Sequence, residues 1–264
     1  FKNNWIFLLN SVLQLPSTDL RFLRGGPAMK LPGSINGLGL FSTDQMQQTK
    51  KLIFTLNYGF HQRGNQSAFS YTLGPGITVR PVRMLKMGVT AGITRNYDIL
   101  QYITTKDYLS SAYFRGGYFF GTIDQSTVSL TFRADLNITP EFSVQYYGSP
   151  FISRGSYKNF KRITDPAAVE IRNRYKNLDN VITEFGQIGL IEYGGTIPDY
   201  FIDNPDFNFH QFRSNLVAKW EYRPGSWLYL VWSGDMTGNT GASGDSWGQS
   251  MKQLFKIHPN NVFL

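Results

Sequence analysis

Apolar and polar residues alternate along much of this chain with the two-residue period of β-strands. In residues 52–60 one face carries Leu, Phe, Leu, Tyr and Phe, and the other carries Ile, Thr, Asn and Gly. Residues 128–136 and 212–222 repeat this pattern, with polar and charged side chains opposite the apolar ones. The pattern predicts strands that each have one apolar and one polar face.

Further strand-like segments bring the expected total to about a dozen strands, and the clearer ones run about 9–12 residues. Globular strands are most often about 5–6 residues long, whereas about 9–11 residues cross a bilayer at a tilt. Strand length therefore favours a membrane-spanning sheet. The weaker alternations lie at 68–79, 87–97, 113–122 and 142–151, and short apolar-rich stretches lie at 5–13, 38–41, 99–103 and 227–232.

A soluble β-sandwich would also alternate, so the placement of charges and aromatic rings has to separate the two classes. Polar faces carry opposite charges two residues apart, as in Arg133 with Asp135, which suits a water-filled lumen. Aromatic residues crowd strand ends, where rings form interfacial girdles; the pairs are Tyr58 with Phe60, Phe119 with Phe120 and Trp220 with Tyr222. We therefore predict an all-β, transmembrane antiparallel β-barrel. Its lumen-facing polar residues would be Asn57, His61, Arg133, Asp135, Arg213, Asn215, Lys219 and Glu221.

The connections between strands differ in length as they do in bacterial barrels, which have short periplasmic turns and long external loops. Residues 14–34, 153–206 and 236–260 are predicted to be long external loops, and 137–141 and 223–225 short periplasmic turns. The assignment of 14–34 holds only if 99–103 is a strand of its own. Asp165 and the Pro-Ala-Ala after it resemble a capped helix start, which predicts a short helical insert in the 153–206 loop.

Composition agrees with a barrel and excludes several other classes. Aromatic residues make up 16% and charged residues 17% of the chain, and the latter share lies below the roughly 25% of soluble domains. There is no cysteine, which excludes disulfides and thiol nucleophiles. The net charge of +8 comes without a nucleic-acid motif, so we expect no nucleic-acid partner. No apolar run approaches the ~20 residues of a spanning helix.

Candidate chemistry is sparse. The three histidines, His61, His210 and His258, lack metal-ligand spacing. Asp203, Asp206 and Asn208 could ligate calcium through oxygen atoms, but an Asx-turn cluster explains them more simply. We therefore expect no catalytic residue, no metal, no cofactor and no enzymatic activity.

The segment LRGGPAMKLPG at 23–33 is the candidate plug loop, carried by Arg24, Gly25, Gly26 and Pro27. Proline and glycine make it a poor spanning strand. Its apolar residues are unusual for a loop in water, so we expect it to fold into or across the barrel mouth, with Arg24 paired to Asp135 or Glu221. A solvated external loop is the alternative.

Five segments together resemble a known family. They are LRGGPAMKLPG, DQSTVSLTFR at 124–133, TPEFSVQYYGSPFISRGSY at 139–157, FRSNLVAKWEYRPGSWLYLVWS at 212–233 and HPNNVFL at 258–264. This set resembles the C-terminal barrel of a Bacteroidetes outer-membrane family (domain of unknown function 5916). The resemblance implies an upstream carbohydrate-binding-module-family-9-like domain and further strands. Residues 1–264 are therefore expected to be a fragment of a larger barrel.

Two functions follow as expectations for such a barrel in the outer membrane of a Gram-negative, Bacteroidetes-like bacterium. The first is a plugged surface anchor or docking component for glycan-handling envelope machinery. The second is an open or gated pore for solutes. A secreted, soluble β-protein is a third interpretation. The expected partners are outer-membrane lipid and lipopolysaccharide, other outer-membrane proteins or lipoproteins, and glycans bound through the upstream domain.

Overall fold

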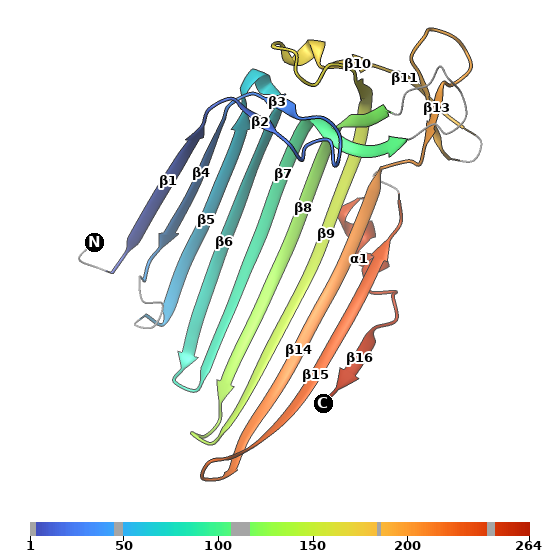
Figure 1. Cartoon of the computed structure of the whole chain (residues 1–264). Helices are drawn as coiled ribbons and strands as arrows, with labels where there is room; N and C mark the ends of the chain where they lie inside the picture. The colour runs from blue at the N-terminus through green and yellow to red at the C-terminus, as the bar shows by residue number, and fades with distance from the viewer. Residues whose placement is uncertain (1–3, 45–49, 107–116, 184–185, 242–245) are drawn as a thin grey trace.

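The computed structural model describes residues 4–44, 50–106, 117–183, 186–241 and 246–264, and its fold is all-β. An 11-stranded antiparallel sheet dominates it (Figure 1). In spatial order its strands are β1 (Ile6–Gln14), β4 (Ser34–Ser42), β5 (Leu52–Arg63), β6 (Ala68–Val82), β7 (Leu85–Lys106), β8 (Gly117–Asn137), β9 (Phe142–Ile163), β14 (Phe207–Arg223), β15 (Ser226–Asn239) and β16 (Asn260–Phe263), and β10 (Tyr175–Asn177) pairs with the end of β9.

The main sheet is an up-and-down meander in which sequential long strands are neighbours. Tight connections join β6 to β7, β8 to β9 and β14 to β15 at one end of the sheet, and the three long connections lie at the opposite end (Figure 1). Within the described ranges β1 pairs only with β4 and β16 only with β15, so both edges of the sheet are open. The all-β prediction is confirmed, and the strands of the described ranges form a sheet that does not close into a barrel.

Two predicted strand breaks are wrong. Residues 87–97 and 99–103 belong to the single strand β7, and 128–136 forms one strand with the described part of 113–122, β8. Register shifts at Asp98/Gln101 and Tyr102/Thr104 interrupt the alternation without ending the strand, as β-bulges do. Each error removes one strand from the predicted number, so together they leave unchanged which end of the sheet each connection lies at. Residues 14–34 therefore lie at the same end as the other long connections even though 99–103 is no separate strand.

The strand register sorts side chains onto two faces, since directly paired residues in an antiparallel sheet point the same way. One face carries the apolar sets predicted for β5, β8 and β14, and we call it the apolar face. Several of its side chains are solvent-exposed, among them Phe54 at 49%, Leu130 at 41% and Trp220 at 49%. The opposite side, the polar face, carries many Asn, Thr, Ser and charged residues, together with Leu8, Leu38 and Leu40 at β1 and β4. The predicted two-faced strands are thus present, and no second sheet layer covers the apolar side in the described part of the chain.

Short elements build a cap at the end with the long connections, which we define as residues 15–33 and 164–206. It contains the hairpin β2 (Ser17–Asp19) with β3 (Met29–Leu31) and a sheet of β11 (Asp179–Ile182), β12 (Ile188–Ile191) and β13 (Tyr200–Ile202). Phe119 and Phe120 are 0% exposed in two apolar clusters beneath these elements. Their predicted place in an interfacial girdle is therefore wrong.

The helical insert lies in a different connection from the one predicted. After Asp165 the chain makes an Asx turn, in which the carboxylate accepts a 3.1 Å hydrogen bond from the Ala167 amide, and only a 3₁₀ turn (Ile171–Asn173) follows. The α-helix α1 (Trp247–Leu254) instead lies between β15 and β16, where Ser246 and Gln249 form a capping box. Another 3₁₀ turn (Gly64–Gln66) joins β5 to β6. No described helix has the length and apolar character that a membrane span requires.

Candidate functional site

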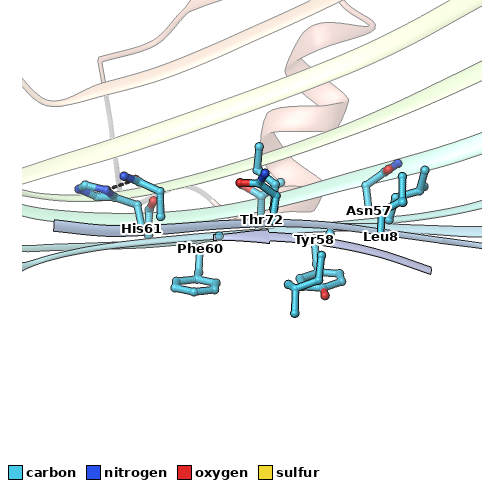
Figure 2. A pocket seen from close by; sticks show the side chains of 15 residues that line it. Leu8, Asn57, Tyr58, Phe60, His61 and Thr72 are labelled. Atoms are coloured by element: carbon cyan, nitrogen blue, oxygen red, sulfur yellow. Dashed lines mark hydrogen bonds between the residues drawn. The ribbon is translucent and has the colours of Figure 1, made fainter. Parts of the chain in front are cut away.

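The polar face of the main sheet is the first part of the candidate site, because the register brings all the predicted lumen residues onto it. Asn57 and His61 alternate with Tyr58 and Phe60 on β5, and Figure 2 shows the two pairs on opposite sides of the sheet. The pairing of β8 through β9 to β14 extends the same face to the other six, Arg133, Asp135, Arg213, Asn215, Lys219 and Glu221.

Hydrogen bonds and ion pairs between neighbouring strands organise this face. His61 Nδ1 lies 2.6 Å from Asn36 Oδ1 (Figure 2), and Arg213 pairs with Asp235 at 3.2 Å. The Lys219 ammonium lies 3.8 Å from the centre of the Trp227 ring. A hollow of about 910 Å³ lies over β1, β4, β5 and β6, and its lining is mixed: polar side chains such as Asn36, Asn57 and His61 stand beside leucines such as Leu8, Leu38 and Leu40. The polar groups of this face are therefore paired with one another across neighbouring strands, and at β1 and β4 leucines interrupt them.

The segment 23–33 forms the second part of the site, since it reaches from the sheet edge across to β7, β8 and β9. Leu23 and Met29 are both 0% exposed and pack with Leu100, Phe120 and Ile163. Part of the segment is therefore packed against the ends of the strands, which a fully solvated loop would lack, and the fold across a barrel mouth stays a prediction. Close approach requires a glycine, because a Cβ on Gly26 would lie 2.4 Å from the Tyr118 ring.

Arg24 does not make the expected ion pair. Its guanidinium lies 4.3 Å from the centre of the Tyr102 ring, at the capped end of β7. Asp135 and Glu221 lie at the other end of the sheet, where Glu221 accepts a 2.7 Å hydrogen bond from the Gly225 amide. The pairing of Arg24 with either carboxylate is therefore wrong, and a cation–π contact takes its place.

Arg174 joins the two halves of the cap. Its guanidinium donates to the carbonyl oxygens of Lys30 at 2.8 Å, Ala168 at 2.8 Å and Val169 at 2.7 Å. The Lys30 amide in turn donates to the Pro166 carbonyl at 3.0 Å. Burial lowers the pKa of Arg174 below its usual value. A single buried side chain thus fastens the 23–33 segment to residues 164–174.

Glu192 is a buried carboxylate in the cap on which several polar side chains converge, and its own side chain is only 2% exposed. It accepts two hydrogen bonds from Arg162, at 2.7 and 2.5 Å, and one from the Tyr200 hydroxyl at 2.9 Å. Lys176 adds an ion pair at 3.7 Å. Burial alone would raise the pKa of Glu192, but these hydrogen bonds and cations outweigh it and the pKa is lowered. Burial and the neighbouring carboxylate raise the pKa of Tyr200.

Sequence reasoning identified neither Arg174 nor Glu192. Glu192 directly follows the buried strand Ile188–Ile191, and a carboxylate at the end of such an apolar run signals a buried charge that needs cations. No sequence pattern near Arg174 could have shown its hydrogen bond to the Lys30 carbonyl, because Lys30 lies 144 residues away in the sequence.

The candidate calcium ligands are engaged in three separate interactions. Asp203 accepts a hydrogen bond from Gln187 at 3.2 Å, Asp206 accepts one from the Tyr157 amide at 2.7 Å, and the Asn208 amide group donates to Ser250 at 3.0 Å. The described residues contain no cluster of His, Asp or Glu suited to a metal ion. An Asx turn is present in this segment, but Asn204 forms it: its side-chain oxygen accepts a 3.0 Å hydrogen bond from the Asp206 amide.

Comparison with known proteins identifies the family. The model of the family described as "Domain of unknown function (DUF5916)" matches residues 1–264, so the chain belongs to this family. Neither a search of curated proteins nor a search of solved structures found a match.

Proposed function

We propose that this chain forms part of the wall of a transmembrane β-barrel in the outer membrane of a Gram-negative bacterium. The exposed apolar face is the observation that carries the proposal. Along β8 its apolar positions continue from Val128 to Leu136, nine residues, which matches the ~9–11 residues that cross a bilayer. Lipid would cover this face as a second sheet layer covers the apolar face of a sandwich.

At the end of the sheet nearest the cap, the apolar face ends in a row of polar and charged residues, as a membrane-spanning wall requires. We call this row the polar border. Arg95 and Asp124 form an ion pair at 3.6 Å on this face, and Arg154 lies in the same row on β9. Beyond this row β7, β8 and β9 continue into the cap. The long strands are therefore explained as a bilayer-crossing part followed by a part that projects into water.

We propose further that the barrel is plugged and serves as a surface anchor or docking component rather than as an open channel. Support comes from the packed cap, in which Leu23 and Met29 are fully buried and Arg174 links two distant segments. The family resemblance adds an upstream glycan-binding module and a Bacteroidetes host to the proposal. A gated pore is the second candidate, favoured by polar side chains such as Asn36, Asn57 and His61 on the polar face. The proposed partners are outer-membrane lipid, lipopolysaccharide and other envelope proteins.

Single-channel conductance separates the two candidates. We expect the full-length protein in planar bilayers to conduct little. Conductance should rise when Arg24→Ala is combined with Gly26→Leu, because the first change removes the Tyr102 contact and the second collides with Tyr118. Arg21→Ala is the matched control, since this exposed arginine lies in the same connection. A high conductance of the unaltered protein would favour the pore, and an unchanged conductance of the double variant would argue against a plug at 23–33.

The connection between β9 and β14, residues 164–206, is expected to face the cell exterior; residues 153–163 of the predicted loop belong to β9. An epitope tag inserted next to Asn177, which is exposed at the end of β10, should bind antibody on intact cells. A tag at Gly225, in the tight β14–β15 turn, should bind only after the outer membrane is permeabilised. The reverse labelling pattern would invert the proposed topology.

A further inference from the structure

Helix α1 packs on the apolar face of the sheet, the side that we propose faces lipid, and this inference rests on that proposed function. The Phe255 ring lies 5.9 Å from the Phe212 ring, and Ser250 exchanges hydrogen bonds with the Asn208 side chain at 3.0 and 3.2 Å. Asn208 and Phe212 alternate with Phe209 and Arg213 and share their face with Leu216 and Trp220. The helix therefore lies outside the proposed barrel wall.

Along the strands, α1 lies at the level of the polar border of the apolar face. Strand pairing places Arg95, Ser126, Arg154 and Asn208 in one row across β7, β8, β9 and β14. The helix begins at this row, where the Arg154 guanidinium lies 4.0 Å from the centre of the Trp247 ring. It then covers the first apolar position below the row, Phe212. In a membrane this level corresponds to the boundary between headgroups and acyl chains.

The exposed residues at the C-terminal end of α1 and directly after it are two cations and an aromatic ring. Lys252 and Lys256 are exposed and one helical turn apart, and Phe255 beside them is 60% exposed. Ser250, which is hydrogen-bonded to Asn208 of the sheet, and Leu254 are both 0% exposed. Residues 246–264 contain no Asp or Glu. A basic polar side next to an exposed ring is the composition of a helix that lies in a membrane interface.

We propose that α1 is an interfacial helix that binds the phosphate groups of an anionic lipid surface through Lys252 and Lys256, with Phe255 inserted among the acyl chains. Alternatively, α1 would only stabilise the sheet through its buried residues Leu254 and Ser250, and lipid charge would then have no effect on the stability of α1. The two alternatives differ in one measurable property, the dependence of the stability of α1 on lipid charge.

Hydrogen exchange of the full-length protein in lipid nanodiscs measures this dependence. One set of discs contains phosphatidylcholine alone, and the other contains equimolar phosphatidylcholine and phosphatidylglycerol. Each lysine near an anionic surface strengthens membrane binding by about fivefold. With two lysines, the protection of residues 247–257 should be up to about 25-fold higher in anionic discs. The gain should shrink at high ionic strength. It should also disappear in the Lys252→Gln/Lys256→Gln variant.

The control is Arg21→Gln/Lys30→Gln, which removes the same charge from exposed cap positions and should keep the gain in full. Equal protection of α1 in both lipids, with residues 128–136 protected in each, would overturn this inference and leave the barrel proposal intact. A gain that survives Lys252→Gln/Lys256→Gln would overturn it as well. Failure of the protein to insert into either disc would instead reject the proposed membrane-spanning function.

Discussion

Replacing Leu130 with arginine is expected to lower the free energy of unfolding from a bilayer by about 2–4 kcal/mol, whereas arginine at Thr131 should have little effect. Leu130 is central in the apolar run of β8 and 41% exposed on the apolar face. In the proposed membrane its replacement would place a cation near the bilayer midplane. Thr131 points to the polar face, where its hydroxyl lies 3.5 Å from that of Ser149, and an arginine there would reach water.

Reversible urea unfolding from phosphatidylcholine vesicles measures both variants against the unaltered protein. Val128→Arg is a further comparison, because Val128 shares the apolar face but lies closer to the polar border and should cost less than Leu130→Arg. A depth-dependent cost on one face and none on the other is specific to a lipid-facing wall. Similar, small costs at Leu130 and Thr131 would contradict the membrane assignment and favour a soluble sheet.

The two faces of the long strands were predictable from sequence because the two-residue period alone decides which side chains share a face. Asn57 and His61, or Arg213 and Lys219, keep their relation whatever the neighbouring strands are. The ends of strands were less predictable. Bulges such as those after Asp98 and Tyr102 shift the alternation by a residue without ending a strand, so a break in period resembled a loop.

The contacts of the cap escaped prediction for a different reason, which is sequence distance. Arg174 contacts Lys30 and Arg162 contacts Glu192, and no local pattern encodes either pairing. The 23–33 segment was predictable only in part. Its apolar residues predicted burial, but the partner of Arg24 was sought among carboxylates when an aromatic ring was closer. Helix α1 has the Ser-x-x-Gln capping box as its local signal, at 246–249, and that signal was overlooked.

Glu192→Ala is expected to have the largest effect in the cap, a loss of about 3 kcal/mol in the free energy of local opening. The carboxylate is 2% exposed and takes three hydrogen bonds, so its removal leaves Arg162 and Tyr200 without their shared acceptor. Hydrogen exchange of residues 188–202 should quicken accordingly. Glu170→Ala is the matched control, because the Glu170–Arg172 pair is exposed and should contribute well under about 1 kcal/mol.

The same network predicts how cap stability depends on pH. The pKa of Glu192 is lowered in the folded protein, so its stabilising contribution is present above the ordinary value of 4.5 and is lost as the pH falls below it. The pKa of Tyr200 is raised, so the folded state favours the neutral hydroxyl, and this contribution is lost as the pH rises through the ordinary value of 10.0. Cap protection should therefore be highest between about pH 5 and pH 9. In Glu192→Gln the decline on the acid side should be absent, because no carboxylate remains to be protonated. If Glu192→Gln loses cap protection at low pH to the same extent as the unaltered protein, other groups cause the loss. Glu192 would then not be the residue that sets the pH dependence of the cap.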